Sequence, residues 1–481
     1  MGIFAGTHFF VQNMNSISQN ILLPLFEDFK SESLPVKIPA AYLENFSGKA
    51  KETITYISPE NQKIIVLGLG KKDDFKTVKN TFRSFFYHNK SKLKGDISIL
   101  FSEKVSSEIS SAVAQGIALA EYEIGHLKSD KSKTESWFSG NYNISLNDNI
   151  DNETFEKGKK IAATQSQIMK WVDTPANFKT PTVLAEWILE SGQKHGFETQ
   201  IFDTEKCKAL GMKALLAVGR GSVENPPQMV ILKYTHPEAT KTVGLVGKGV
   251  TFDTGGVSLK PGDNMNYMKS DMGGAAAVAG TFEAAARLKL KINLIGAIPL
   301  TENCIDSLAV KPGDVIGSYL GKTIEVINTD AEGRLILADA LAYVVKNHPT
   351  DYLIDLATLT GNCIQALGYA AAAMLTHNDA LADSLSSSGT KTGEKVWRMP
   401  LWDDYKDMMK SDIADIKNLS SAPIAGAITA AKFLEEFVEN HPAWAHLDIA
   451  GVAFGDSEFG SMKSATGYGV NLLIDWLENN S

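Results

Sequence analysis

Acidic and lysine side chains gather on glycine-rich segments in the second half of the chain. Several of these residues that converge on one place would repel each other or pair poorly, because an unpaired buried charge costs several kcal/mol. Divalent cations hold such oxygen-rich groups together. The pattern therefore predicts a two-metal cluster. Its candidate residues are Lys248, Asp253, Lys260, Asp271, Asp330 and Glu332.

The carboxylates of this group also have ordinary structural interpretations. Asp271 would cap a helix expected from Met272, and Asp330 and Glu332 would be solvated turn acids. If their segment is extended, Asp330 and Glu332 share one side of it. The neighbouring glycines, which allow tight loops, favour the metal cluster over these separate roles.

Other catalytic patterns in the sequence are incomplete. The glycine that follows Lys248 replaces the Ser or Thr of a phosphate loop, and Lys260 replaces the last glycine of a nucleophile elbow around Ser258. The zinc-protease motif HExxH is absent from the sequence. No serine triad can therefore be built on the segment around Ser258, and the usual zinc-protease helix is excluded.

The expected elements place the acids and lysines beyond strand ends, where open α/β sheets bind ligands. Strands alternating with helices predict a first α/β domain with a largely parallel sheet, and the same alternation further along predicts a second α/β domain. A polar stretch over 126–152 marks the boundary between them. The expected strands are 54–57, 63–69, 96–101, 229–234, 242–246, 292–298, 323–327 and 352–356, and the expected helices are 106–124, 153–172, 183–195, 272–288 and 334–346. The expected division is an N-terminal domain over 1–150, a linking helix over 151–175 and a C-terminal catalytic domain over 176–481.

Composition narrows the class of protein. The net charge of −9 argues against a protein built to grip phosphate backbones. The longest apolar run, 366–375, is about half the ~20 residues that a membrane span needs. The start of the chain lacks a basic residue before its apolar stretch, and the three scattered cysteines suit reduced thiols, so we expect a cytoplasmic protein without a membrane partner.

Three segments contain most of the candidate residues: VGKGVTFDTGG at 246–256, KSDMGGA at 269–275 and NTDAEGRL at 328–335. Together with 355–361 and 444–451 they closely resemble the leucyl aminopeptidase family of cytosolic two-metal peptidases. The resemblance implies two α/β domains, a small N-terminal macro-like domain and a larger C-terminal mixed-sheet catalytic domain.

The resemblance assigns the ligands of two divalent metal ions, Mn or Zn. Asp253 and Glu332 would bridge the ions, Lys248 and Asp271 would complete the tighter site, and Asp330 the more exchangeable one. A lysine ligand must be neutral, so Lys248 would be uncharged when it binds metal. By ligand softness alone, this set of oxygens and one nitrogen favours Mg or Mn, whereas family members use Zn, Mn or Co.

The resemblance also implies catalytic roles for Lys260 and Arg334. Lys260 would stay protonated and stabilise the oxyanion that forms on the scissile carbonyl. Arg334 cannot be a base, because its guanidinium stays protonated. It would hold a bicarbonate ion that takes the proton of the attacking, metal-bridged water. The implied substrate contacts are Met268, Asn328, Thr358, Leu359, Gly361, Ala450 and Ala453.

The implied activity is the release of leucine-like N-terminal residues from peptides. Family members are homohexamers, so we expect a homohexamer here. The alternative from another enzyme class is a two-metal phosphoesterase, which would use the same carboxylates but would need cationic groups for phosphate. A further alternative is an additional DNA-binding regulatory role, as in some bacterial relatives.

Overall fold

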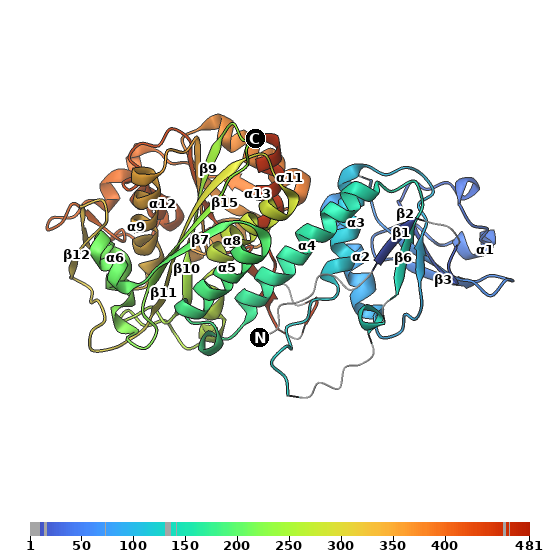
Figure 1. Ribbon diagram of the computed structural model, residues 1–481, viewed down its shortest axis with the longest axis horizontal. Coiled ribbons are helices and arrows are strands. Elements are labelled where there is room, and N and C mark those ends of the chain that lie inside the picture. The colour runs from blue at the N-terminus through green and yellow to red at the C-terminus, as the bar shows by residue number, and fades with distance from the viewer. Residues whose placement is uncertain are drawn as a thin grey trace. The chain divides into compact units, whose positions relative to one another are not determined.

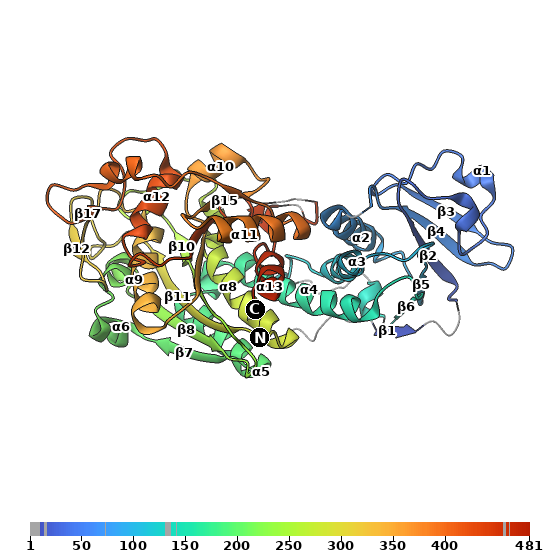
Figure 2. The same cartoon turned by 90° about the horizontal axis from the view of Figure 1, so that it is seen from above.

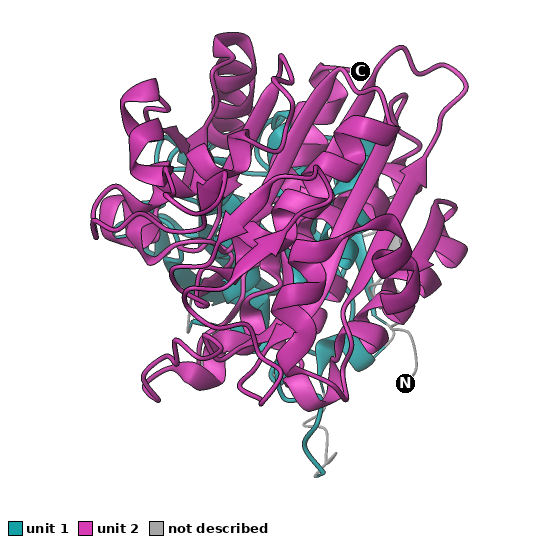
Figure 3. Cartoon of the chain, turned by 90° about the vertical axis from the view of Figure 1, so that its left-hand side faces the viewer, with its two compact units in different colours: residues 1–166, 458–461 teal, residues 167–457, 462–481 magenta. Residues whose placement is uncertain are grey.

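The computed structural model describes residues 10–13, 17–72, 74–129, 136–140, 142–455, 458–460 and 462–481. The chain divides into two compact units (Figure 3). They are Met1–Ser166 with Glu458–Ser461, and Gln167–Ser457 with Met462–Ser481. The start of the chain, which contributes to the expectation of a cytoplasmic protein, lies outside the described residues. So do seven residues of the polar stretch expected at 126–152, namely 130–135 and 141.

Unit 1 is built on a largely parallel sheet, as the sequence predicts. Its strand order is β1-β6-β5-β2-β4-β3, and only β3 runs antiparallel to its neighbour among the described pairs. β3 is an edge strand with alternating exposure, whereas β2 and β4 are buried almost throughout. The strands are β1 (Phe10–Asn13), β2 (Asn20–Leu25), β3 (Thr53–Ile57), β4 (Lys63–Gly68), β5 (Ile97–Ile99) and β6 (Asn143–Leu146). The helices are α1 (Ala40–Leu43), α2 (Phe75–Asn89), α3 (Ser107–Leu119) and the start of α4 (Asn152–Asp173).

Unit 2 is built on a nine-stranded mixed sheet. Its central strands β18, β14, β9 and β11 are parallel, so their carboxyl ends meet at one edge. The described order is β16-β15-β18-β14-β9-β11-β8-β7, and β10 pairs with the far end of β11. These strands are β7 (Glu198–Phe202), β8 (Gln228–Tyr234), β9 (Thr242–Gly247), β10 (Gly249–Asp253), β11 (Asn293–Asn303), β14 (Tyr352–Ala357), β15 (Ala372–Leu375), β16 (Val396–Arg398) and β18 (Trp444–Asp448).

Helices cover both faces of this sheet (Figures 1 and 2). α5, α8 and α13 lie on one face, and α7, α9 and α12 on the other. A Cβ atom on Gly274 of α8 would come within 2.0 Å of the Leu356 carbonyl oxygen, so this glycine lets α8 approach β14 closely. The helices are α5 (Pro181–His195), α6 (Thr204–Leu210), α7 (Lys213–Val218), α8 (Gly273–Leu288), α9 (Glu332–Asn347), α10 (Gly361–Leu367), α11 (Asp379–Thr392), α12 (Gly426–Glu435) and α13 (Val470–Asn479). Smaller sheets join β12 (Val315–Gly317), β13 (Thr323–Glu325) and β17 (Ile416–Lys417), and β19 (Phe454–Gly455) with β20 (Ser464–Ala465).

Two local possibilities that the sequence left open at the site are not found in the structure. The segment of Asp330 and Glu332 is not extended, because Glu332 is already the first residue of α9. Asp271 does not cap α8, since Met272 holds the cap position and no side chain makes the capping hydrogen bond there. Across the described residues, we find no helix with the length and apolar character of a membrane span.

Candidate metal centre

The carboxyl edge of the central strands supplies the site. Lys248 lies between β9 and β10, Asp253 ends β10, and Asn303 ends β11. Thr358 follows β14, and Asp448 ends β18. The parallel arrangement of these strands therefore brings together side chains that are up to 200 residues apart in the sequence. This agrees with the expectation that ligands bind beyond the carboxyl ends of the strands in an open α/β sheet.

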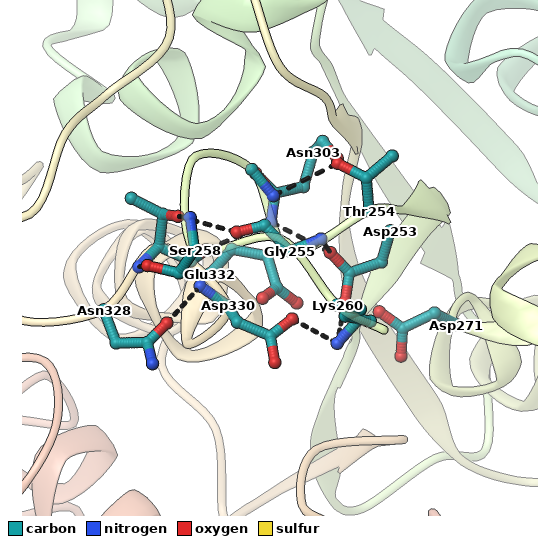
Figure 4. Close-up of polar contacts among 12 residues, drawn as sticks. Asp253, Thr254, Gly255, Ser258, Lys260, Asp271, Asn303, Asn328, Asp330 and Glu332 are labelled. Carbon is teal, nitrogen blue, oxygen red and sulfur yellow. Dashed lines mark hydrogen bonds and ion pairs between the residues drawn. The ribbon is translucent and has the colours of Figure 1, made fainter. Parts of the chain in front are cut away.

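Three carboxylates converge at the centre of this edge. Asp253, Asp330 and Glu332 each offer an oxygen atom, and these atoms lie within 4.8 Å of one another. The side chains of Asp253 and Glu332 are buried, and that of Asp330 is 33% exposed. Lys260 Nζ lies 2.8 Å from Asp253 Oδ2 and also contacts Asp330 (Figure 4).

Lys248 joins the remaining carboxylate to this cluster. Its Nζ lies 2.7 Å from Asp271 Oδ2 and 3.0 Å from Glu332 Oε1, and it donates a hydrogen bond to the Thr358 carbonyl oxygen at 3.0 Å. Thr358 Oγ1 in turn donates to Asp271 Oδ1 at 2.8 Å. The structure therefore brings all six predicted cluster residues together.

The cluster carries excess negative charge. Burial raises the pKa of Glu332 to about 8 and that of Asp271 to about 6, and it also raises the pKa of Asp330. Burial alone would lower the pKa of Lys248, but the carboxylates around its ammonium group raise it above the ordinary value. Four carboxylates face two lysines, so divalent cations would complete the charge balance, and this set of oxygens with one amine nitrogen suits them.

Two glycines fold the loop between Asp253 and Lys260. The φ angles of Gly255 and Gly256 are 88° and 64°, in the left-handed region where L side chains are strained. A Cβ atom on Gly256 would also lie 2.7 Å from Asn303 Oδ1. The loop can therefore return Lys260 to the carboxylates only with glycine at these positions.

Asn303 and Thr329 hold this loop in place, and the sequence analysis missed both. Asn303 Nδ2 donates to Asp253 Oδ1 at 2.9 Å and to the Thr329 carbonyl oxygen at 3.0 Å. Thr329 Oγ1 donates to the Gly255 carbonyl oxygen at 2.6 Å and accepts from the Ser258 N–H at 2.8 Å. These bonds fix one carboxylate of the cluster and connect the loop to the turn that carries Asp330.

Arg334 lies in the first turn of α9 and is buried. Its Nη1 donates to the Asn418 carbonyl oxygen at 3.0 Å, while its Nε has no hydrogen-bond partner. Within the described part of the chain, no carboxylate lies within ion-pair distance of its guanidinium group. Burial lowers the pKa of Arg334 to about 10, so the group is still charged at neutral pH. A buried charge with free donors beside a helix N-terminus suits an anion.

Asp448 organises the loop that follows β14. It lies in the segment 444–451 that resembles the family, but the sequence analysis assigned it no role. Its Oδ1 accepts from the N–H groups of Leu359 at 3.1 Å and Ala450 at 3.2 Å, and its Oδ2 accepts from Thr360 Oγ1 at 2.5 Å. This carboxylate therefore connects two segments in which substrate contacts were expected. Gly361 follows directly as the first residue of α10.

The other expected substrate residues lie on neighbouring loops. Met268 is half-buried on the short 3-10 helix Met265–Ser270, which precedes Asp271. Ala453 is buried and lines a small, mainly apolar cavity with Gly273 of α8. Asn328 Oδ1 accepts from the Asp330 N–H at 2.7 Å, so this side chain also shapes the carboxylate turn.

A carboxylate and lysine cluster at the carboxyl edge of a centrally parallel sheet defines a metal-binding α/β protein. The chain belongs to the cytosol aminopeptidase family. The model of the family's catalytic domain matches residues 167–474, and that of its N-terminal domain matches residues 40–131.

Individual relatives agree with this assignment. A probable cytosol aminopeptidase of Chlorobium phaeobacteroides is 42% identical over 464 residues, which cover 92% of each chain. That of Chloroherpeton thalassium is 51% identical over 325 residues, which cover 67% of this chain and 64% of the relative. The solved structure of the bottromycin maturation enzyme BotP in complex with Mn has a TM-score of 0.85 and 30% identity, with 96% of this chain and 99% of that chain covered.

Proposed function

We propose that this chain is a two-metal aminopeptidase that releases leucine-like N-terminal residues from peptides. The observation that carries the proposal is the convergence of Asp253, Asp330 and Glu332 within 4.8 Å beside two lysines. Family membership supports a metal-dependent peptidase, and the structurally similar BotP was solved in complex with Mn.

The chain's own residues have separate roles in this proposal. Asp253, Glu332, Lys248, Asp271 and Asp330 would hold two Mn or Zn ions. The ions would polarise the scissile carbonyl and make a water molecule more acidic. Lys248 must lose its proton to act as a ligand, and neighbouring dications favour that loss.

Lys260 and Arg334 would act on the reacting groups. The Lys260 ammonium would donate to the carbonyl oxygen as negative charge develops on it. Arg334 would hold a bicarbonate ion near the first turn of α9, where free N–H groups also favour an anion. Arg334 would thereby place an acceptor for the proton of the attacking water.

Small and apolar side chains near the cluster would select the first residue of the peptide. We assign this role to Met268, Thr358, Gly361, Ala450 and Ala453, with Leu359 and Asn328 nearby. Apolar lining with few polar groups suits a leucine-like side chain. The Asp448 carboxylate would keep this loop in place through its three hydrogen bonds.

Two chromogenic substrates test the proposed function. The purified chain with Mn²⁺ should hydrolyse leucyl-p-nitroanilide and leave p-nitrophenyl phosphate intact. Hydrolysis of the phosphate ester alone would favour the phosphoesterase. A gel shift of duplex DNA that weakens as salt is added would support the further regulatory role.

We further propose that the chain assembles as a homohexamer and acts in the cytoplasm. The names of its relatives, cytosol aminopeptidases, support the location. Light scattering should give about six times the chain mass, and a mass of 52.2 kDa would contradict the assembly.

Replacing Lys260 with alanine should lower kcat while metal content stays unchanged. The expected loss is about 10²- to 10³-fold, the range for removal of one group that stabilises an oxyanion. Lys311→Ala is the matched control, since Lys311 is 59% exposed and pairs only loosely with Asp314 at 3.8 Å. Steady-state kinetics with metal analysis measure both effects, and a kcat near the wild-type value would remove Lys260 from the mechanism.

A further inference from the structure

Asn418 contacts both Arg334 and the turn over residues 327–331, which carries Asp330. It directly follows β17, which pairs with β13, and its N–H donates to the Glu325 carbonyl oxygen at 2.9 Å. The side chain is completely buried. Backbone hydrogen bonds therefore hold Asn418 at the end of this strand pair, independently of the contacts of its side chain.

The side-chain amide of Asn418 is bound to the turn that precedes Glu332. Its Oδ1 accepts from the N–H groups of Ile327 at 2.8 Å and Asn328 at 3.4 Å. Its Nδ2 donates to the carbonyl oxygens of Asn328 at 2.8 Å and Ala331 at 3.3 Å. An amide group has two donor hydrogens and an acceptor oxygen with two lone pairs, so these four bonds use its full capacity.

The main chain of Asn418 makes the second connection. Its carbonyl oxygen accepts the hydrogen bond from Arg334 Nη1 at 3.0 Å. The bonded turn contains Asp330 and leads directly into Glu332. One residue thus contacts both sides of the segment that carries two proposed metal ligands, and also the proposed anion-binding arginine.

We propose that Asn418 is a positioning residue that sets the geometry of Asp330 and Glu332 for metal binding and holds Arg334 beside them. This inference rests on the proposed function for the identity of the ligands. Hydrogen-bond partners of metal ligands typically change metal affinity or activity by about 10- to 100-fold when they are altered. Asn418 does not contact the carboxylates of the ligands themselves. It binds the backbone of the turn that carries them.

Asn418→Asp is the sharpest test, because it changes the amide nitrogen to oxygen without changing its shape. The new oxygen would face the carbonyl oxygens of Asn328 and Ala331, where two hydrogen bonds had been. Titration calorimetry with Mn²⁺ alone should show about 10- to 100-fold weaker binding. At saturating Mn²⁺, kcat should stay below that of the wild type while KM changes little.

Asn378→Asp is the matched control. Asn378 also accepts from a backbone N–H, of Leu381 at 2.8 Å, and donates to a backbone carbonyl, of Pro442 at 3.1 Å. It caps α11, where none of the proposed site residues lies. This control adds the same carboxylate outside the site and should bind Mn²⁺ as the wild type does.

The outcomes separate the inference from the proposed function. Wild-type Mn²⁺ affinity in folded Asn418→Asp, or equally weakened affinity in Asn378→Asp, would overturn the role of Asn418. If Asn418→Asp does not fold, Asn418→Ser removes the same amide and is judged by the same titration. A wild-type chain that binds Mn²⁺ but cleaves no leucyl-p-nitroanilide would instead contradict the proposed function, since the titration does not depend on activity.

Discussion

Exhaustive chelation of the purified chain should reduce hydrolysis of leucyl-p-nitroanilide to the uncatalysed rate, and Mn²⁺ or Zn²⁺ should restore it. The physical reason is that the thiols of the chain and the segment around Ser258 do not supply an activated nucleophile in place of a metal-bound water. Burial raises the pKa of the Cys304 thiol to about 11 and those of Cys207 and Cys363 to about 12, so all three remain protonated at neutral pH. The sequence around Ser258 lacks the glycine of a nucleophile elbow.

Metal content and rate should be measured on the same samples. Mass spectrometry of the protein after dialysis against chelator gives the metal bound per chain, and the rate should fall in proportion to it. Re-addition of Mn²⁺ controls for irreversible damage. Full activity in chain freed of metal would contradict the proposed mechanism.

Replacing Arg334 with alanine should lower the rate by about 10²- to 10⁴-fold, the usual contribution of general-base catalysis, with both metals retained. The alanine variant removes the proposed bicarbonate holder without removing a metal ligand. Lysine at this position should restore the rate only partly, because it lacks the planar fork that matches two oxygens of a carbonate. Arg398→Ala is the control, since Arg398 pairs with the exposed Asp379 at 2.6 Å.

Added bicarbonate separates this role from a structural one. Wild-type activity in carbonate-depleted buffer should rise with bicarbonate, and Arg334→Ala should respond far less. If both enzymes respond equally, Arg334 has only a structural role. Its hydrogen bond to the Asn418 carbonyl oxygen would then be its main contribution.

The sequence predicted the parts of the fold whose chemistry is local. Continuous apolar runs mark β4, β8 and β9, because both faces of these strands are buried. β18 was missed because two polar side chains interrupt it: buried His446 pairs with Asp355 at 2.6 Å, and Asp448 ends the strand. Only one residue separates β10 from β9, so the pair resembled one strand followed by a loop.

The residues of the candidate site also fall into those that the sequence predicted and those that it did not. Glycines and acids that are close in sequence marked the cluster, so all six of its residues could be named from the sequence alone. The roles of Asn303, Asp448 and Asn418 could not, because they depend mainly on hydrogen bonds to backbone or side chains 26 to 91 residues away. A single asparagine or aspartate has no pattern that reveals such a distant partner.

The two lysines in the cluster bear on how the protein matures. Lys248 and Lys260 contact the four carboxylates and so offset part of the repulsion among the acids. Small zinc domains, by contrast, stay unfolded until metal arrives. We therefore expect this chain to fold before it binds metal.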